Sequence, residues 1–318
     1  MIEAINENAI PAGARFLPQY RDPTLTPSAT NPGALPDAFL RPIAGYGDIS
    51  IIQTTGHSKY DSLQLQLTRR FTGGFEMAGS YTFAKGSVHH GAENAPNILQ
   101  YDSNPLPSRD DRSDIQEHVM VVSYTYEIPN GSHAFGGNSV AKAFLDSWRL
   151  SGISTFGTGG RGDVTATYSP AFEFTGGGEG CFGYQNGGTT AGGQPYDVVG
   201  SLELPSDQRS VDMWFNTANV VPAKGVGDVG NGCERWKFRM PGWNNHDLTL
   251  FKDMRLKHNQ LLEYRWEIYN LFNQVSFNAV NTAATFNPTT GAQTNTNFGK
   301  VTSARTERRM QMSLRYRF

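Results

Sequence analysis

The sequence lacks long apolar runs, has few cysteines and carries no large excess of either charge. No apolar stretch approaches the ~18 residues that a membrane-spanning helix needs, which excludes a helical membrane protein. The two cysteines fit no metal-binding spacing. The 27 Lys and Arg nearly balance the 29 Asp and Glu, so the charge indicates no basic face for nucleic acid. Residues 1–13 contain no basic start followed by an apolar core, so no signal peptide is expected there.

The sequence is rich instead in glycine and aromatic residues, with 35 Gly and 12% aromatics at a mean hydropathy of −0.46. A transmembrane β-barrel escapes hydropathy analysis because only alternate residues face lipid. The polar average is therefore compatible with a membrane location.

Alternation of apolar and polar residues is clearest at the end of the chain. In Arg309–Phe318, five apolar residues alternate with five polar ones, three of which are arginines. In a strand these two sets point to opposite faces of the sheet. Together with similar or weaker patterns upstream, this segment predicts eight strands of an antiparallel transmembrane β-barrel. They lie at 48–55, 60–71, 75–83, 118–128, 147–156, 244–256, 262–272 and 309–318.

The organisation along the chain fits that prediction. Residues 1–47 hold seven prolines and are predicted to form a loop or linker, whereas 48–318 are predicted to form a partial barrel. If the C-terminus is periplasmic, the long connections fall on the opposite side, as is typical of outer-membrane barrels. These long connections are 87–116, 157–243 and 273–308. Short apolar stretches inside them, at 164–168 and 298–304, are interpreted as hairpins within loops.

Seven short motifs, in order across residues 46–318, carry a resemblance to a known family. They are Tyr60–Phe71, Gly79–Lys85, Trp148–Ile153, Trp214–Thr217, Pro241–Leu248, Glu267–Asn273 and the pair Phe298-Gly299 with Thr302–Arg305. On these stretches the chain resembles the C-terminal barrel of the plug-containing, carboxypeptidase-regulatory-like TonB-dependent receptors with an Oar-like barrel.

The resemblance implies an all-β fold in which this chain supplies about eight C-terminal strands of a barrel of about 22. The family also has a plug and a TonB-contacting segment, and neither is recognised in this sequence. We therefore expect a fragment that takes part in uptake of a ligand without transporting it alone. The resemblance further implies insertion into a Gram-negative outer membrane, with Tyr316 and Phe318 in the signal for the barrel-assembly machinery. Expected partners are outer-membrane lipid, that machinery and TonB, through the segment not recognised here.

Individual residues yield few candidates for chemistry. A lumen-facing ladder of charges is predicted from Glu263, Arg265, Glu267, Arg315 and Arg317. Cys181 and Cys233 both fall in the 157–243 connection, where a disulfide is favoured over two free thiols. No catalytic residue set, cofactor site or metal site is predicted, so no enzyme is expected.

Two charged stretches are interpreted as ordinary loop surface. The mixed acidic and basic residues of Ser108–Glu117 favour a solvated loop over a calcium site, since the glycine of a calcium loop is missing. Adjacent residues of an extended chain point in opposite directions, which makes His89-His90 with Glu93 a poor metal site. Arg161-Gly162-Asp163 is interpreted as turn sequence rather than an adhesion motif.

Two alternatives remain beside the partial receptor barrel. A stand-alone barrel of eight strands would close with a filled interior, although connections of 30 to nearly 90 residues are large for it. A soluble secreted β-rich binding protein would instead bury the apolar face of each strand in a core.

Overall fold

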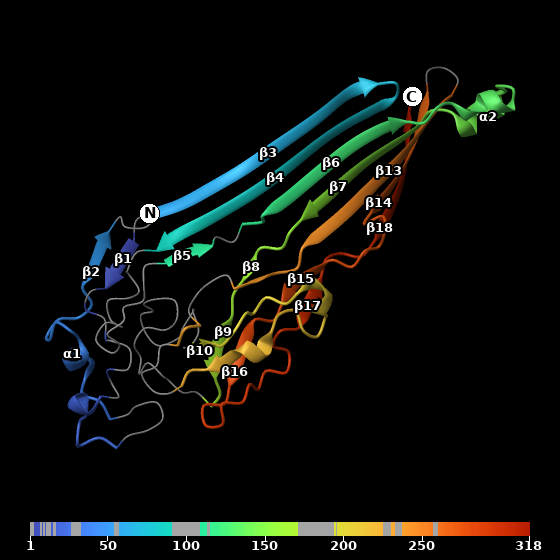
Figure 1. Ribbon diagram of the computed structural model, residues 1–318. Coiled ribbons are helices and arrows are strands. Elements are labelled where there is room, and N and C mark those ends of the chain that lie inside the picture. The colour runs from blue at the N-terminus through green and yellow to red at the C-terminus, as the bar shows by residue number, and fades with distance from the viewer. Residues whose placement is uncertain are drawn as a thin grey trace.

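The chain folds as a long curved sheet with a module of loops and short strands at one end (Figure 1). The computed structural model describes residues 3–6, 8, 10, 14, 17–26, 33–53, 57–90, 109–112, 115–170, 194, 196–224, 230–232, 237–256 and 260–318. We call the described residues of 158–242 and 270–308 the loop module.

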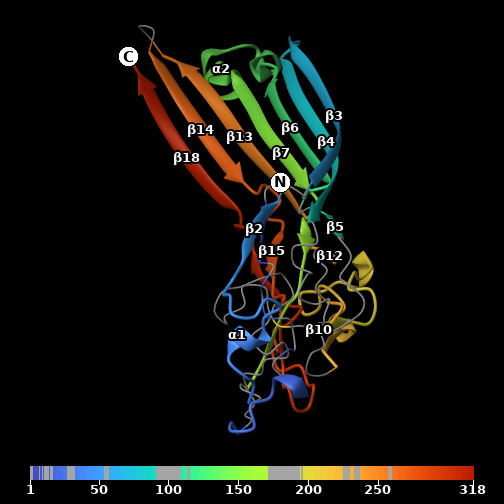
Figure 2. The same cartoon turned by 90° about the vertical axis from the view of Figure 1, so that its left-hand side faces the viewer.

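The main sheet is antiparallel throughout and has the order β18-β14-β13-β7-β6-β4-β3, with β5 beside β4. Figure 2 shows its strands side by side in one twisted layer. Among the described residues, β3 and β18 each have a single neighbour, so the sheet is open. The strands are β3 (His57–Thr72), β4 (Phe75–His90), β5 (Arg109–Arg112), β6 (His118–Glu127), β7 (Trp148–Gly157), β13 (Trp243–Arg255), β14 (Leu261–Tyr269) and β18 (Arg309–Arg317).

Seven of the eight expected strands lie in this sheet, and one expectation was wrong. The segment 48–55 contains only β2 (Ser50–Gln53), which pairs with β1 (Glu3–Asn6) outside the main sheet. The eighth member is instead the short β5, inside the expected connection 87–116. The strand β4 also continues to His90, past the expected end at residue 83.

The connections differ between the two ends of the sheet. At one end, called the turn end, Gly73 and Gly74 join β3 to β4 with φ of +62° and +79°, a backbone that tight hairpins require and glycine readily adopts. The C-terminus and the short helix α2 (Ser139–Leu145) lie at this same end (Figure 1). The expected long connections begin at the opposite, loop end, where β4, β7 and β14 end (Figure 1). That these connections are external loops stays a prediction.

The hydrophobic core lies in the loop module rather than in the sheet. It gathers buried side chains from segments far apart in the sequence, among them Val164, Tyr196, Phe215, Phe238 and Phe286. The short elements around it are β8 (Arg161–Gly162), β9 (Thr165–Tyr168), β10 (Tyr196–Val198), η5 (Ser206–Gln208), η6 (Thr217–Asn219), β11 (Val220–Pro222), β12 (Phe238–Arg239), β15 (Phe277–Val280), β16 (Ala283–Phe286) and β17 (Val301–Ala304).

Pairing within the module corrects the interpretation of 164–168 as a hairpin. The strand β9 pairs in parallel with β16, more than 110 residues away, because both contribute to the module core. The segment 298–304 contributes β17, which pairs antiparallel with β15. Neither segment joins the main sheet, as expected.

The N-terminal segment has a small cluster of its own. The buried Asn8 side chain donates hydrogen bonds to the carbonyl oxygens of Ile43, Tyr46 and Gly47, which ties the start of the chain to the approach to β2. In the same segment, Ile10, Ala14, Ala34 and Leu40 form a buried apolar cluster. The division at residues 47 and 48 stays a prediction. The remaining described helices are η2 (Pro18–Tyr20), α1 (Asp37–Leu40) and η4 (Gly131–Phe135). No described helix is long and apolar enough to cross a membrane.

Candidate functional site

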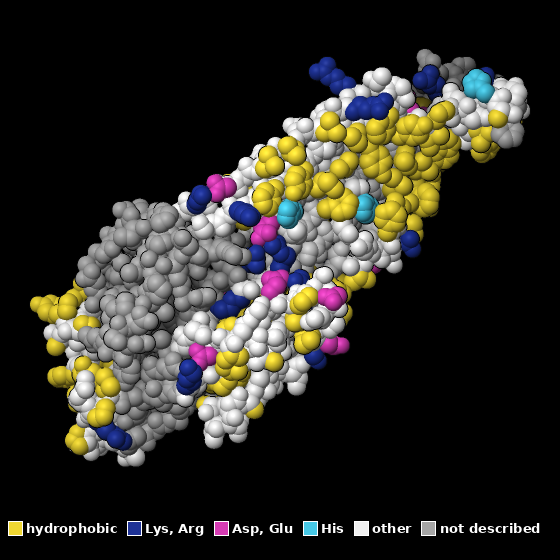
Figure 3. Space-filling model, in the orientation of Figure 1, with side chains coloured by type: hydrophobic (Ala, Val, Ile, Leu, Met, Phe, Trp, Pro, Cys, Tyr) yellow, Lys and Arg dark blue, Asp and Glu magenta, His cyan; other side chains and the backbone are white. Residues whose placement is uncertain are grey.

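The pairing register places most of the large apolar residues of the seven long strands on one face of the sheet. Across three successive strands, for example, Leu250 lies opposite Trp266, and Trp266 lies opposite Met312. Figure 3 shows hydrophobic side chains gathered over this face. Its members include Leu63, Leu65, Leu67, Met77, Tyr81, Met120, Val122, Tyr124, Leu150, Phe156, Leu248, Leu250, Trp266, Ile268, Met310, Met312, Leu314 and Tyr316.

This apolar face is exposed, and its extent suits strands that cross a membrane. Leu65 is 56% exposed and Met312 is 62% exposed. From Met310 to Phe318 the eight steps of ~3.4 Å span about 27 Å along the strand, or about 20 Å of height at the ~35–45° tilt of barrel strands, which is most of their ~25 Å apolar band. The expected assembly residues Tyr316 and Phe318 stack at 5.9 Å at the turn end of this band. Their role in assembly stays a prediction.

The cation Lys252 lies on the apolar face near the turn end and is buried there. Lys252 is only 3% exposed, because its ammonium group donates to the Asp146 carbonyl oxygen and lies over the Trp148 ring. The indole N–H of Trp148 in turn donates to the carbonyl oxygen of Phe144 at 2.8 Å. These contacts fix the end of α2 against the apolar face at the turn end.

The opposite face of the sheet is polar and holds all five residues of the predicted charge ladder. Glu263 lies opposite Arg315 and forms an ion pair with Arg317 at 3.1 Å. Arg265 forms an ion pair with Glu267. Phe251, a large aromatic on this face, lies between the guanidinium groups of Arg265 and Arg149, at 5.1 and 4.7 Å. The structure thus places the ladder on one face, and its exposure to a lumen stays a prediction.

A polar corner joins this face to the loop module. Asn270 follows β14 with φ of +52°, and its backbone N–H donates to the Asp247 carboxylate at 2.9 Å. The Asn270 side chain donates to the carbonyl oxygens of Gln274 and Thr306. Two of the motifs that carry the family resemblance, Pro241–Leu248 and Glu267–Asn273, therefore meet in one turn. Beside the corner lies a polar cleft of about 710 Å³, which includes Arg305, Glu307 and Arg309.

An ion network lies where the sheet meets the module, a junction at which charged side chains gather in Figure 3. Glu117 pairs with Arg161 at 3.0 Å and with Arg239 at 2.6 Å. Glu203 pairs with Arg161 at 3.7 Å and with Arg209 at 2.6 Å. Burial raises the pKa of Glu117, but the hydrogen bonds and charges of Arg239 and Arg161 outweigh it, so the pKa lies below its ordinary value. Glu117 was thus wrongly interpreted as a solvated loop residue.

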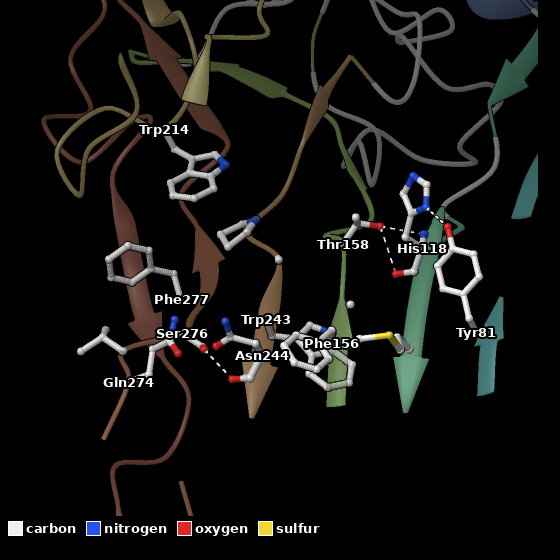
Figure 4. A pocket seen from close by; sticks show the side chains of 15 residues that line it. Tyr81, His118, Phe156, Thr158, Trp214, Trp243, Asn244, Gln274, Ser276 and Phe277 are labelled. Carbon is white, nitrogen blue, oxygen red and sulfur yellow. Dashed lines mark hydrogen bonds between the residues drawn. The ribbon is translucent and has the colours of Figure 1, made fainter. Parts of the chain in front are cut away.

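A pocket of about 510 Å³ opens where the apolar face meets the loop module. We call it the rim pocket. Figure 4 shows Tyr81 and His118 on one side of it and Trp214 and Phe277 on the other. The Tyr81 hydroxyl and His118 Nδ1 lie 2.8 Å apart, and the rings of Trp214 and Phe277 meet edge to face at 5.9 Å.

The remaining candidates fall in two groups. Cys181, Cys233 and Glu93 lie outside the described residues. In the sequence Arg161-Gly162-Asp163, Arg161 belongs to the ion network and Asp163 pairs with Lys237 at 3.7 Å, so both charged residues have structural contacts. Among the residues that the structure describes, no three His, Cys, Asp or Glu side chains gather closely enough to hold a metal ion.

Comparison with known proteins identifies the family to which this sheet, with one apolar and one polar face, belongs. The sequence profile of the outer membrane beta barrel domain matches residues 4–311. The chain belongs to this family. No curated protein and no solved structure matches it.

Membership of the outer membrane beta barrel domain family indicates which face of the sheet contacts lipid. The protein is located in the outer membrane. In such barrels the apolar band contacts lipid and the polar side chains face inward. The exposed apolar face of this sheet is thus its lipid-contacting surface.

Sequence reasoning missed the ion network and the rim pocket of this barrel domain. The partners of Glu117 lie 44 and 122 residues further along the chain, and no local pattern links them. The role of Asn270 could have been suspected from the sequence. It lies in the motif Glu267–Asn273, where Asn and aromatic residues directly follow a strand.

Proposed function

We propose that the chain is the C-terminal barrel part of a TonB-dependent receptor in a Gram-negative outer membrane. In this role it supplies lipid-facing strands and part of the wall through which a ligand is taken up. It does not transport alone, since energised uptake in such receptors requires a plug and contact with TonB. The proposal includes no catalytic activity, cofactor or nucleic-acid partner.

The open sheet is the observation that carries this proposal. Backbone groups at a sheet edge have no water to bind in the bilayer core, so an open edge in lipid is costly. Among the described residues, both β3 and β18 present such an edge, while the apolar face runs unbroken between them. Closure into a barrel requires further strands between these two edges. A barrel of about 22 strands would supply them.

The polar corner supports the same proposal. Asp247 and Asn270 lie in two of the motifs that resemble the receptor family, and they hold the loop end of β13 and β14 together through hydrogen bonds. A corner of this kind fixes the path from barrel strand to outer loop. In receptors of this class, the outer loops together with the plug contact the ligand.

Two measurements test the proposal. The DNA upstream of Met1 is sequenced, and an antibody against the β18 segment is used on outer-membrane fractions. We expect an in-frame plug and further strands, and a band far above 34.9 kDa. That product should also bind the periplasmic domain of TonB. A band near 34.9 kDa with a stop codon directly upstream would refute the receptor proposal.

A stand-alone small barrel is the second candidate, because β5 brings the main sheet to eight members. However, β5 pairs with β4 on the side that faces β6, so the edges remain β3 and β18, and closure of the chain alone would require these two strands to pair. Refolding of the chain in detergent separates the candidates. A heat-modifiable, protease-resistant form of the chain alone would favour the small barrel, whereas its absence is expected for part of a larger one.

A further inference from the structure

We propose that the rim pocket binds a membrane glycolipid, with an acyl chain on the lipid-facing sheet and an uncharged, hydroxylated head group between the sheet and the loop module. This inference goes beyond the proposed receptor function and does not depend on it. It rests on the lipid-facing surface and on the composition of the pocket.

The pocket has two walls of different origin. One wall is a continuation of the lipid-facing surface, formed by Tyr81, Met120 and Phe156 of three adjacent strands. The other wall comes from the loop module, where Trp214 and Phe277 stand opposite the sheet (Figure 4). Aromatic side chains are common in flat girdles at membrane interfaces. Here the two walls enclose about 510 Å³, within the usual size range of a binding site for a small molecule.

The position of the pocket suits a lipid rather than a free solute. The apolar residues of β4 and β6 end at this level, as Tyr81 and Phe83 lie beside His118, the first residue of β6. A lipid whose chain lies along the apolar face would therefore place its head group in the pocket. Val275, at the pocket's rim, is 67% exposed and extends the apolar contact beyond the sheet.

The polar groups of the pocket indicate the kind of head group. His118, Asn244, Gln274 and Ser276 line it, together with Thr158. None of the described residues that line it is Lys, Arg, Asp or Glu. A phosphate group is usually met by Lys or Arg, with which it forms strong charge-assisted hydrogen bonds. Neutral donors and acceptors beside aromatic rings fit the hydroxyl groups and C–H faces of a sugar.

The test uses the full gene product, reconstituted from outer membranes into phosphatidylcholine nanodiscs. The probe is a glucosyl diacylglycerol that carries a diazirine in one acyl chain close to the sugar. After irradiation, cross-linked peptides are mapped by mass spectrometry. We expect labelling of the β4, β6 and β7 segments and of residues 274–277. Dodecyl maltoside should compete, while dodecylphosphocholine should compete far less and maltose not at all.

Two matched substitutions make the test specific. Val275→Trp fills the pocket mouth, whereas Val199→Trp changes an equally exposed valine elsewhere in the loop module, at 66% exposure. Labelling should fall about tenfold in Val275→Trp, the loss expected from removing ~1.4 kcal/mol of binding, and stay unchanged in Val199→Trp. Gln274→Ala is a smaller change at an exposed residue and should also lower labelling. It replaces Val275→Trp in the test if that variant does not fold.

Three results would overturn the proposal. Equal labelling of the two tryptophan variants would remove the pocket from the interaction. Labelling spread evenly along the apolar face would mean that only bulk lipid is contacted. Competition by maltose as strong as by dodecyl maltoside would show that a free sugar, and not a lipid, is bound.

Discussion

The sheet and the loop module use apolar residues in opposite ways. In the sheet, Leu65 and Met312 point outward and are more than half exposed. In the module, Phe215 is completely buried, stacked on Phe238 at 4.1 Å and edge to face with Phe298. The same residue types thus form a surface in one region and a core in the other, because one region is surrounded by lipid and the other by water.

The two regions consequently depend on different interactions. The sheet is stabilised by its ladder of backbone hydrogen bonds, and its apolar side chains contact lipid in the bilayer. The module is held by a packed core and by the ion network around Glu117. A substitution that is severe in one region should therefore be mild in the other, and this can be tested residue by residue.

The largest effect is expected from Phe215→Ala in the module core. Removing a buried phenylalanine typically costs about 3–5 kcal/mol. Because the cost falls on the module, its amides should exchange faster and its segments become sensitive to protease, while the sheet remains heat-modifiable. Leu65→Ala is the matched control, since it truncates an exposed apolar side chain of the sheet. Equal damage by both substitutions would contradict the contrast between the regions.

A somewhat smaller effect is expected from charge on the lipid-facing surface. Leu314→Arg places a cation towards lipid and should cost about 2–4 kcal/mol near the middle of the bilayer. Ser313→Arg, one residue earlier in β18, points to the polar face opposite Arg265 and should cost only about 0.2–1 kcal/mol, from repulsion between the two cations. The measurement is the inserted, heat-modifiable fraction in outer membranes. Reversal of this order would mean that the lipid face has been assigned to the wrong side.

How far the sequence predicts these regions depends on how local each pattern is. The alternation in Arg309–Phe318 lies within ten residues, so it predicts the strand and both of its faces. The segment 48–55 was wrongly predicted as a strand of the main sheet. Ile51 and Ile52 are adjacent there and would point to opposite faces, so its alternation is broken.

The loop module could not be predicted, because its order is not local. The pairing of β9 with β16 joins segments that are 118 residues apart and have no repeating pattern. The ion network likewise brings Glu117, just before β6, together with Arg161 and Arg239 from the two ends of the 157–243 connection. The reason for one glycine in the sheet could not be predicted either. At Gly152 an added Cβ would lie 2.4 Å from the Tyr124 ring, and this close approach is seen only once the strands are paired.

A moderate effect is expected from Glu117→Gln at the junction of the two regions. Loss of the carboxylate removes partly exposed ion pairs with Arg161 and Arg239, at a cost of about 1 kcal/mol. Because the folded pKa of Glu117 is lowered, its stabilisation is present above the ordinary carboxylate pKa and is lost as pH falls through the lowered value. Protection of the module against protease should therefore decline below that ordinary pKa in the native chain. Glu117→Gln should show a weaker decline, and an unchanged pH profile would exclude Glu117 as the titrating group.

The smallest effect is expected from Arg317→Gln on the polar face of the sheet. Its ion pair with Glu263 is well exposed, with Arg317 at 51%, and such pairs contribute about 0–1 kcal/mol. Stability of the inserted sheet should hardly change, whereas Tyr316→Gln, its neighbour on the lipid-facing surface, should lower the inserted fraction measurably. The comparison is sharp because the two positions share a strand edge and differ only in the face they occupy. A larger loss from Arg317→Gln than from Tyr316→Gln would mean that the polar face, and not the lipid-facing surface, stabilises this edge.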